Sequence, residues 1–280
     1  MRVLYIIVVS TLAIIKSYAQ PAAETLGGRS AGMGYVSATL RDSWSVFHNP
    51  AGLNGVGEAA VSLAYTNRYN VESFRTMAVA GVMPFKNRSV GIGISRFGDR
   101  LFSESRLVLG AATHLSGVDI GARIGYVQIM TLGLETRGLP FLDFGVITKL
   151  TDELSIGASL HHINQPQVTE FEDERLPALV RAGIHYKPVE RFNFYWETQK
   201  ENAQKIAFQA GAEYEWHQGF FARIGFSSVP QKAYFGLGGT WKNLQLDYAF
   251  NTHPRLGLSH QVSISYLIEK KAETLIESEE

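Results

Sequence analysis

The strongest constraint on the fold of this chain is an alternation of apolar and polar residues that recurs from residue 59 to residue 268. In one such segment, Leu246 and Tyr248 alternate with Gln245 and Asp247. Because successive side chains of a β-strand point to opposite faces, this period predicts strands with one apolar face each. The sequence therefore predicts an all-β protein built from antiparallel strands.

The residue types on the two faces distinguish a membrane barrel from a soluble sandwich, since both alternate. The less apolar face is rich in Gly, Ser and Ala with single charges, which is typical of the crowded interior of a closed barrel. The apolar face of a strand often ends in an aromatic residue, which is where membrane barrels place aromatic rings at the two membrane interfaces. These residues are Tyr65, Tyr126, Tyr186, Trp216, Phe226, Trp241 and Tyr266. Scattered aromatic residues in a soluble core are the alternative interpretation.

The lengths of the connections favour the membrane barrel. Short turns are expected near Lys86, Ser116, Asp152, Gln218 and Asn243 and at residues 187–191, with mostly longer loops between them. Outer-membrane barrels have short periplasmic turns, longer outer loops and an even number of strands. We therefore predict a transmembrane antiparallel β-barrel of about 14 strands over residues 58–268.

The two ends of the chain differ from this pattern. Arg2, an apolar stretch at residues 3–15 and Ser17-Tyr18-Ala19 predict a cleaved signal peptide at residues 1–19, because the apolar stretch is short for a transmembrane anchor, the competing interpretation. Residues 20–57 do not alternate and are expected to form a plug in the barrel, and residues 269–280 a charged periplasmic tail. The expected location is the outer membrane of a Gram-negative-type bacterium.

Composition excludes several classes of function. Lys and Arg total 26, as do Asp and Glu, so the zero net charge gives no reason to expect a nucleic-acid partner. The chain has no cysteine, which excludes lipoprotein anchoring, disulfides and thiolate metal sites.

Catalytic and cofactor motifs are weak. The glycine-rich residues 27–34 lack the Lys of a phosphate-binding loop. His161 and His162 are adjacent, so on a strand they point to opposite faces and cannot share a metal. His114 and His185 have no evident Ser or carboxylate partner. We therefore predict no enzyme and no catalytic, cofactor or metal site.

Charges on the inward face are candidates for a structural network, because charge inside a narrow barrel is costly unless it is paired. An ion path is the alternative. The predicted members of this lumen network are Arg123, Arg181, Glu213, Arg223 and Asp247, with Glu215 nearby. The acidic residues 170–175 are expected to form a solvated outer loop, or else a partner contact.

Both ends of the mature chain resemble a known superfamily. Residues 27–53 end in Asn49-Pro50-Ala51-Gly52-Leu53, and LDYAF at 246–250 is followed by LGLSHQVSISY at 256–266. These segments resemble FadL-like outer-membrane barrels, and more closely their PorV/PorQ-like branch. The resemblance implies a fourteen-stranded barrel whose N-terminal hatch contains Asn49, Pro50, Ala51, Gly52 and Leu53.

The resemblance implies two functions. FadL-like members move hydrophobic compounds inward, whereas PorV-like members are accessory barrels of type IX secretion that bind the translocon or cargo. Short outer loops and an interior inferred to be Gly, Ser and charge favour an accessory subunit of a type IX-like secretion complex, in contact with outer-membrane lipid and a larger translocon or secreted cargo protein. A FadL-type channel for hydrophobic compounds is the alternative, and an outer-membrane hydrolase ranks third.

Overall fold

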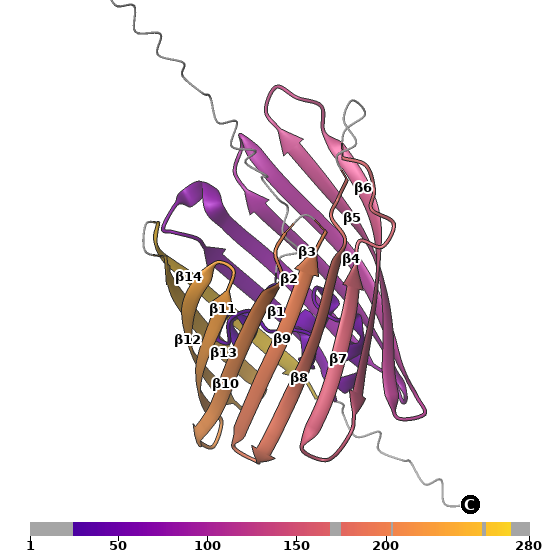
Figure 1. The fold of residues 1–280 in the computed structure, drawn as a ribbon, viewed down its shortest axis with the longest axis vertical. Coiled ribbons are helices and arrows are strands. Elements are labelled where there is room, and N and C mark those ends of the chain that lie inside the picture. Colours follow the sequence, from indigo (N-terminus) through magenta and orange to yellow (C-terminus); the bar gives the residue numbers. More distant parts are fainter. Residues whose placement is uncertain (1–24, 169–174, 203, 254–255, 270–280) are drawn as a thin grey trace, which may run out of the picture.

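The computed structural model describes residues 25–168, 175–202, 204–253 and 256–269. Within these ranges, fourteen antiparallel strands form one closed barrel, in which each strand pairs with its sequence neighbours and β14 pairs with β1 (Figure 1). The strands are β1 (Ala59–Asn67), β2 (Arg75–Pro84), β3 (Arg88–Gly98), β4 (Phe102–Leu115), β5 (Val118–Thr131), β6 (Arg137–Lys149), β7 (Leu154–His161), β8 (Leu179–Val189), β9 (Phe192–Glu201), β10 (Ala207–His217), β11 (Phe220–Ser228), β12 (Gln231–Trp241), β13 (Leu244–His253) and β14 (Gly257–Ile268). The predicted fold class is confirmed.

Short turns gather at one end of the barrel, here called the turn end, where β1 begins and β14 ends. Ser116 and Gly117 make the β4–β5 turn with φ of 48° and 85°, the left-handed geometry of tight hairpins. The opposite end is called the loop end. Strands there extend further than the sequence predicts, so β11 and β12 are joined by Val229 and Pro230 alone, and β5 and β6 by residues 132–136.

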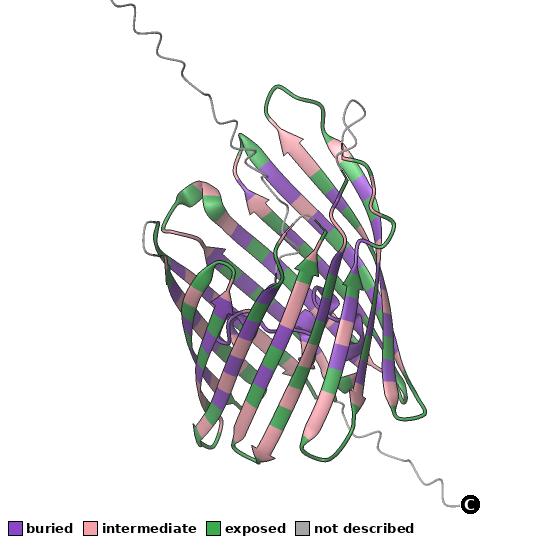
Figure 2. Ribbon diagram, in the orientation of Figure 1, coloured by how far each residue is buried: buried purple, intermediate pink, exposed green. Residues whose placement is uncertain are grey.

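Large apolar side chains are exposed on the outside of the barrel. Exposed and buried residues alternate along its strands (Figure 2). Phe235 and Leu246 point outward, whereas Gly236, Gly238 and Asp247 are buried inside. The aromatic residues expected at the membrane interfaces are all exposed on the outer face. No helix in the described part of the chain is long and apolar enough to cross a membrane.

Residues 25–57, here called the plug segment, lie inside the barrel as three short helical turns and their connections (Figure 1). These turns are α1 (Gly28–Gly32), η1 (Ser43–Val46) and η2 (Pro50–Gly55). Another short turn, η3 (Glu72–Phe74), lies in the loop between β1 and β2. α1 packs against β11 to β14, and η2 packs against β3 to β6, so the plug segment spans the interior.

Candidate functional site

The sequence signature Asn49 to Leu53 forms the start of η2 and fixes it to the wall. Asn49 caps the turn, because its Oδ1 accepts the Ala51 N–H at 3.1 Å. Its Nδ2 lies 2.7 Å from the carbonyl oxygen of Ala38 and 3.1 Å from that of Val146 on β6. Asn49 therefore joins two parts of the plug segment to a barrel strand.

Pro50, Gly52 and Leu53 shape the same contact. Pro50 occupies the first position of η2, where its fixed φ suits a helical turn and its missing N–H is not needed. A Cβ at Gly52 would lie 2.3 Å from the Leu40 carbonyl oxygen, so only glycine fits there. Leu53 is fully buried against Gly91 and Gly110 of the wall.

Arg223 is the centre of the charge cluster on β10 to β13. Its Nε donates to Glu213 Oε2 at 2.7 Å, and its Nη1 donates to Asp247 Oδ1 at 2.7 Å. Gly238 of β12 lies between the two, and a Cβ there would be 2.6 Å from both Arg223 Nη1 and Asp247 Oδ1. Arg29 of α1 also binds Glu213, at 2.8 Å, so this cluster ties the plug segment to the wall.

Arg123 and Arg181 belong to other clusters. Arg123 Nε donates to Asp143 Oδ2 at 2.8 Å, and its Nη1 donates to the Val46 carbonyl oxygen at 2.6 Å. Arg181 Nη1 donates to Ser37 Oγ at 2.7 Å, and Arg181 Nε lies 3.8 Å from Glu197 Oε1.

The single lumen network predicted from the sequence is therefore divided among separate clusters, each of which holds the plug segment. Sequence reasoning missed Arg29, Asp143 and Glu197. Asp143 could have been found, because it is the register partner of Arg123 across β5 and β6. Glu215 lies at the turn end, where its Oε1 accepts the Gly219 N–H, and joins none of the described clusters.

The histidine predictions need correction. His161 and His162 are both buried, although strand alternation predicts that they lie on opposite faces. β7 ends at His161, and His162 has a φ of 53°, so the strand alternation no longer applies and its ring packs inward on Phe141. His114 does have a carboxylate partner, since its Nδ1 lies 2.8 Å from Asp119 Oδ1 across the β4–β5 hairpin.

The interior contains an apolar cluster on one side, which the predicted lining of Gly, Ser and charge does not include. Inward residues of β1, β2, β4, β5 and β6 form one apolar cluster with Leu26, Trp44, Val46, Phe47 and Leu53 of the plug segment. We call this the apolar half; its wall residues are Ala60, Ala64, Ala78, Ala80, Val82, Val108, Ala112, Val127, Leu139 and Phe141. The same wall also carries buried charge: Arg106 binds Glu104, Arg123 binds Asp143, and Asp119 is buried on β5. β8 to β14 carry the Arg181 and Arg223 clusters and form the polar half.

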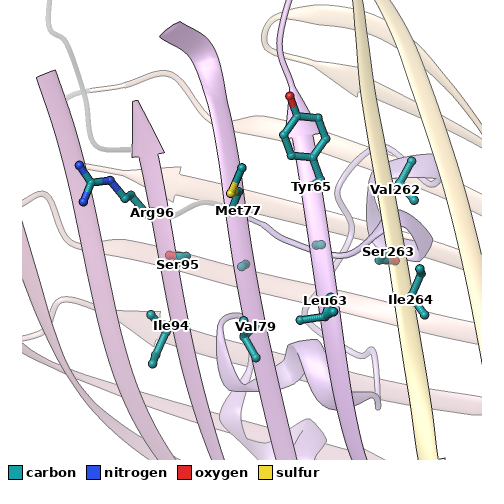
Figure 3. A pocket seen from close by; sticks show the side chains of 12 residues that line it. Leu63, Tyr65, Met77, Val79, Ile94, Ser95, Arg96, Val262, Ser263 and Ile264 are labelled. Atoms are coloured by element: carbon teal, nitrogen blue, oxygen red, sulfur yellow. The ribbon is translucent and has the colours of Figure 1, made fainter. Parts of the chain in front are cut away.

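The outer surface has an apolar hollow of about 510 Å³ over β14, β1, β2 and β3. Figure 3 shows Leu63, Met77, Val79 and Ile94 standing on the outward face around it. These side chains belong to the exposed belt, so the hollow is part of the outer surface and does not open into the interior. No group of three or more metal-binding side chains occurs in the described residues.

The fold and its internal plug define a class of plugged fourteen-stranded barrels, and comparison with known proteins agrees at the level of fold. No family model and no curated protein matches the chain. Among solved structures, the toluene transporter TbuX of Ralstonia pickettii aligns with a TM-score of 0.63 and 15% identity, over 89% of this chain and 100% of that chain. The toluene transporter TodX of P. putida gives 0.67 and 12%, over 89% and 100%.

A TodX monoaromatic hydrocarbon channel mutant, deltaS2S3, aligns with a TM-score of 0.69 and 12% identity, over 88% of this chain and 99% of that one. At such identities the likeness concerns the fold. The chain therefore shares the fold of these transporter and channel barrels, and its fourteen strands agree with the number that the resemblance of its two ends implies. None of these comparisons places it in the PorV/PorQ-like branch.

Proposed function

We propose that this chain is an outer-membrane barrel that admits small hydrophobic molecules, the alternative named in the sequence analysis. The observation that carries the proposal is the apolar half of the interior. A hydrophobic solute crosses a barrel readily only where the lining does not require it to displace bound water or break polar contacts.

The outer face supports insertion into a membrane. Large apolar side chains are exposed on every side of the wall, and an area of this kind would drive aggregation in water. Closure of the barrel pairs the strand edges, as a lipid environment requires. The signal peptide predicted at residues 1–19 would export the chain across the inner membrane, and these residues lie outside the described ones.

The apolar half extends along the height of the barrel. Leu139 and Val127 lie toward the loop end, Val108 lies below them, and Ala112 and Val82 lie toward the turn end. Plug residues fill the space beside these wall residues. Passage therefore requires that the plug segment move away from the wall.

The secretion-accessory hypothesis depended on an interior of Gly, Ser and charge, which would offer no apolar path. The apolar half weakens that argument although ion pairs lie beside it, and the similar solved structures are described as hydrocarbon transporters. The hydrophobic-transport alternative is therefore the better supported of the two.

A cysteine lock tests whether the plug segment must move. A Cβ at Gly183 would lie 3.0 Å from the Ala38 Cβ, so a disulfide, which spans about 3.5–4.5 Å, needs these two positions to move apart by about half an ångström. The native chain has no cysteine that could interfere. Uptake of labelled toluene is measured in whole Gram-negative cells, because toluene dissolves directly into plain phospholipid vesicles. We expect the Ala38→Cys/Gly183→Cys barrel to lose toluene uptake when oxidised and to regain it under dithiothreitol.

The two single-cysteine variants are the matched controls, and their uptake should not respond to oxidation. Uptake by cells with the native barrel that is no faster than by cells without it would reject the proposed function. Undiminished uptake through the oxidised double variant would show instead that the plug segment need not move.

A further inference from the structure

A polar cavity of about 330 Å³ lies at the loop end of the polar half. Thr25, Gly34 and Tyr35 of the plug segment contribute to its lining, and the rest comes from the β1–β2 loop, the loop-end parts of β8 to β14 and two of the loops that join them. Here it is called the vestibule. It is separate from the wall residues of the apolar half, none of which lines it.

Two carboxamides that line the vestibule have buried acceptors without partners. Gln209 on β10 is 4% exposed and Asn251 on β13 is 6% exposed. Among the described residues, Gln209 Oε1 and Asn251 Oδ1 accept no hydrogen bond. A buried acceptor left unsatisfied costs about 1–3 kcal/mol, so a partner is expected for each.

Donors and aromatic rings line the same space. Lys232 Nζ donates to the Tyr69 hydroxyl at 3.1 Å and lies 5.1 Å from the centre of that ring. The rings of Tyr35 and Tyr234 meet edge to face at 5.3 Å. Tyr35 and Tyr69 have φ of 66° and 57°, a conformation that is strained for a bulky residue and is often kept at binding sites.

These groups restrict the chemistry of an occupant. An anion without a hydroxyl group has no proton to give to the free oxygens of Gln209 and Asn251. A cation would meet Arg68, Arg181 and Lys232 against Glu201, the one carboxylate among the described lining residues. A hydrocarbon would leave the carboxamide oxygens unpaired. A hydroxyl group both donates and accepts, and a sugar ring has an apolar face that suits tyrosine.

We propose that the vestibule binds a small, neutral, polyhydroxylated molecule of the mono- or disaccharide class. Its hydroxyl groups donate to Gln209 Oε1 and Asn251 Oδ1, and its ring lies against the tyrosines. This site goes beyond the passage of hydrophobic molecules and does not depend on it, because it lies in the other half of the barrel.

Saturation-transfer difference NMR tests the site with maltose as the probe and the full barrel in lipid nanodiscs. We expect transfer to maltose from the native barrel, and affinity lower by about fivefold in Gln209→Met and again in Asn251→Leu, one hydrogen bond each. The variants should fold, because an apolar group of similar shape replaces an unsatisfied one. Gln128→Met, on the exposed face of β5, is the matched control and should bind as the native barrel does.

Absence of transfer to maltose, glucose and sorbitol would overturn the proposal and leave water as the occupant of the vestibule. Undiminished transfer in the Gln209→Met/Asn251→Leu double variant would overturn it as well. Binding of a long dextran distinguishes a site for free sugars from a site for the end of a glycan chain. Binding of maltose alone identifies a free sugar, whereas binding of both identifies the end of a glycan chain, and either result supports the site.

Discussion

Arg223 illustrates how a buried charge in this barrel serves the wall and the plug together. It binds Glu213 and Asp247, and Arg29 of the plug segment shares Glu213. Removing the guanidinium would leave Asp247 and part of Glu213 buried without compensation. Arg223→Met should therefore lower the free energy of unfolding by about 3–5 kcal/mol.

Urea unfolding in phospholipid bilayers measures this effect. Arg191→Met is the matched control, because Arg191 is exposed in the β8–β9 turn and its loss should change stability by less than about 0.5 kcal/mol. Equal stability of the two variants would contradict the structural role of the cluster.

Gly121 marks the closest approach of the signature segment to the wall. A Cβ there would lie 2.3 Å from Ala51 N and 2.4 Å from Pro50 C, and neither backbone atom can move without displacing η2. Gly121→Ala should therefore destabilise the docked plug by about 1–3 kcal/mol. At Gly239 the nearest atoms to an added Cβ are 3.9 Å away, so Gly239→Ala should be tolerated.

The temperature at which the barrel loses its compact, fast-migrating form on a gel compares the two glycine variants. Gly121→Ala should melt below the native barrel and Gly239→Ala close to it. The same melting temperature for both would mean that η2 does not press on β5.

At the scale of elements, the strands follow from the alternating pattern, whereas their ends do not. Alternation fixes which face of β13 is apolar, because Leu246 must lie opposite Asp247 in an extended chain. It cannot show where pairing stops. β5 and β6 extend into residues expected to form a loop, and β7 stops at His161, so His162 turns inward.

The outward position of Leu246 on β13 allows a test of whether the wall faces lipid. Leu246 on the wall and Leu256 beyond it are 49% and 52% exposed, so in water the two should tolerate a charge equally. In a bilayer, Leu246→Arg should lower the free energy of unfolding by about 2–4 kcal/mol and Leu256→Arg by about 0–1 kcal/mol. Folding titrations in lipid vesicles measure both, and equal costs would show that the wall around Leu246 does not face lipid.

At the scale of the whole molecule, the strand number and the short turns could be predicted, because turn residues and alternation are local signals. The partition of the interior could not. Ala64 and Ala78 are register partners on β1 and β2, but their contact with Phe47 and Leu53 depends on the path of the plug segment, which no local signal in the sequence predicts. Likewise, Arg29 and Glu213 meet only because the plug segment runs past β10 inside the barrel.

The orientation of the barrel gives the last prediction. β1 begins and β14 ends at the turn end, so both ends of the barrel wall lie on one side, as an even strand number requires. Outer-membrane barrels place such short turns in the periplasm. An impermeant maleimide should therefore label Thr136→Cys, in the β5–β6 loop, on intact cells but not Gln218→Cys, in the β10–β11 turn. Permeabilised cells serve as the control, because both cysteines should then react; labelling of Gln218→Cys alone on intact cells would reverse the orientation.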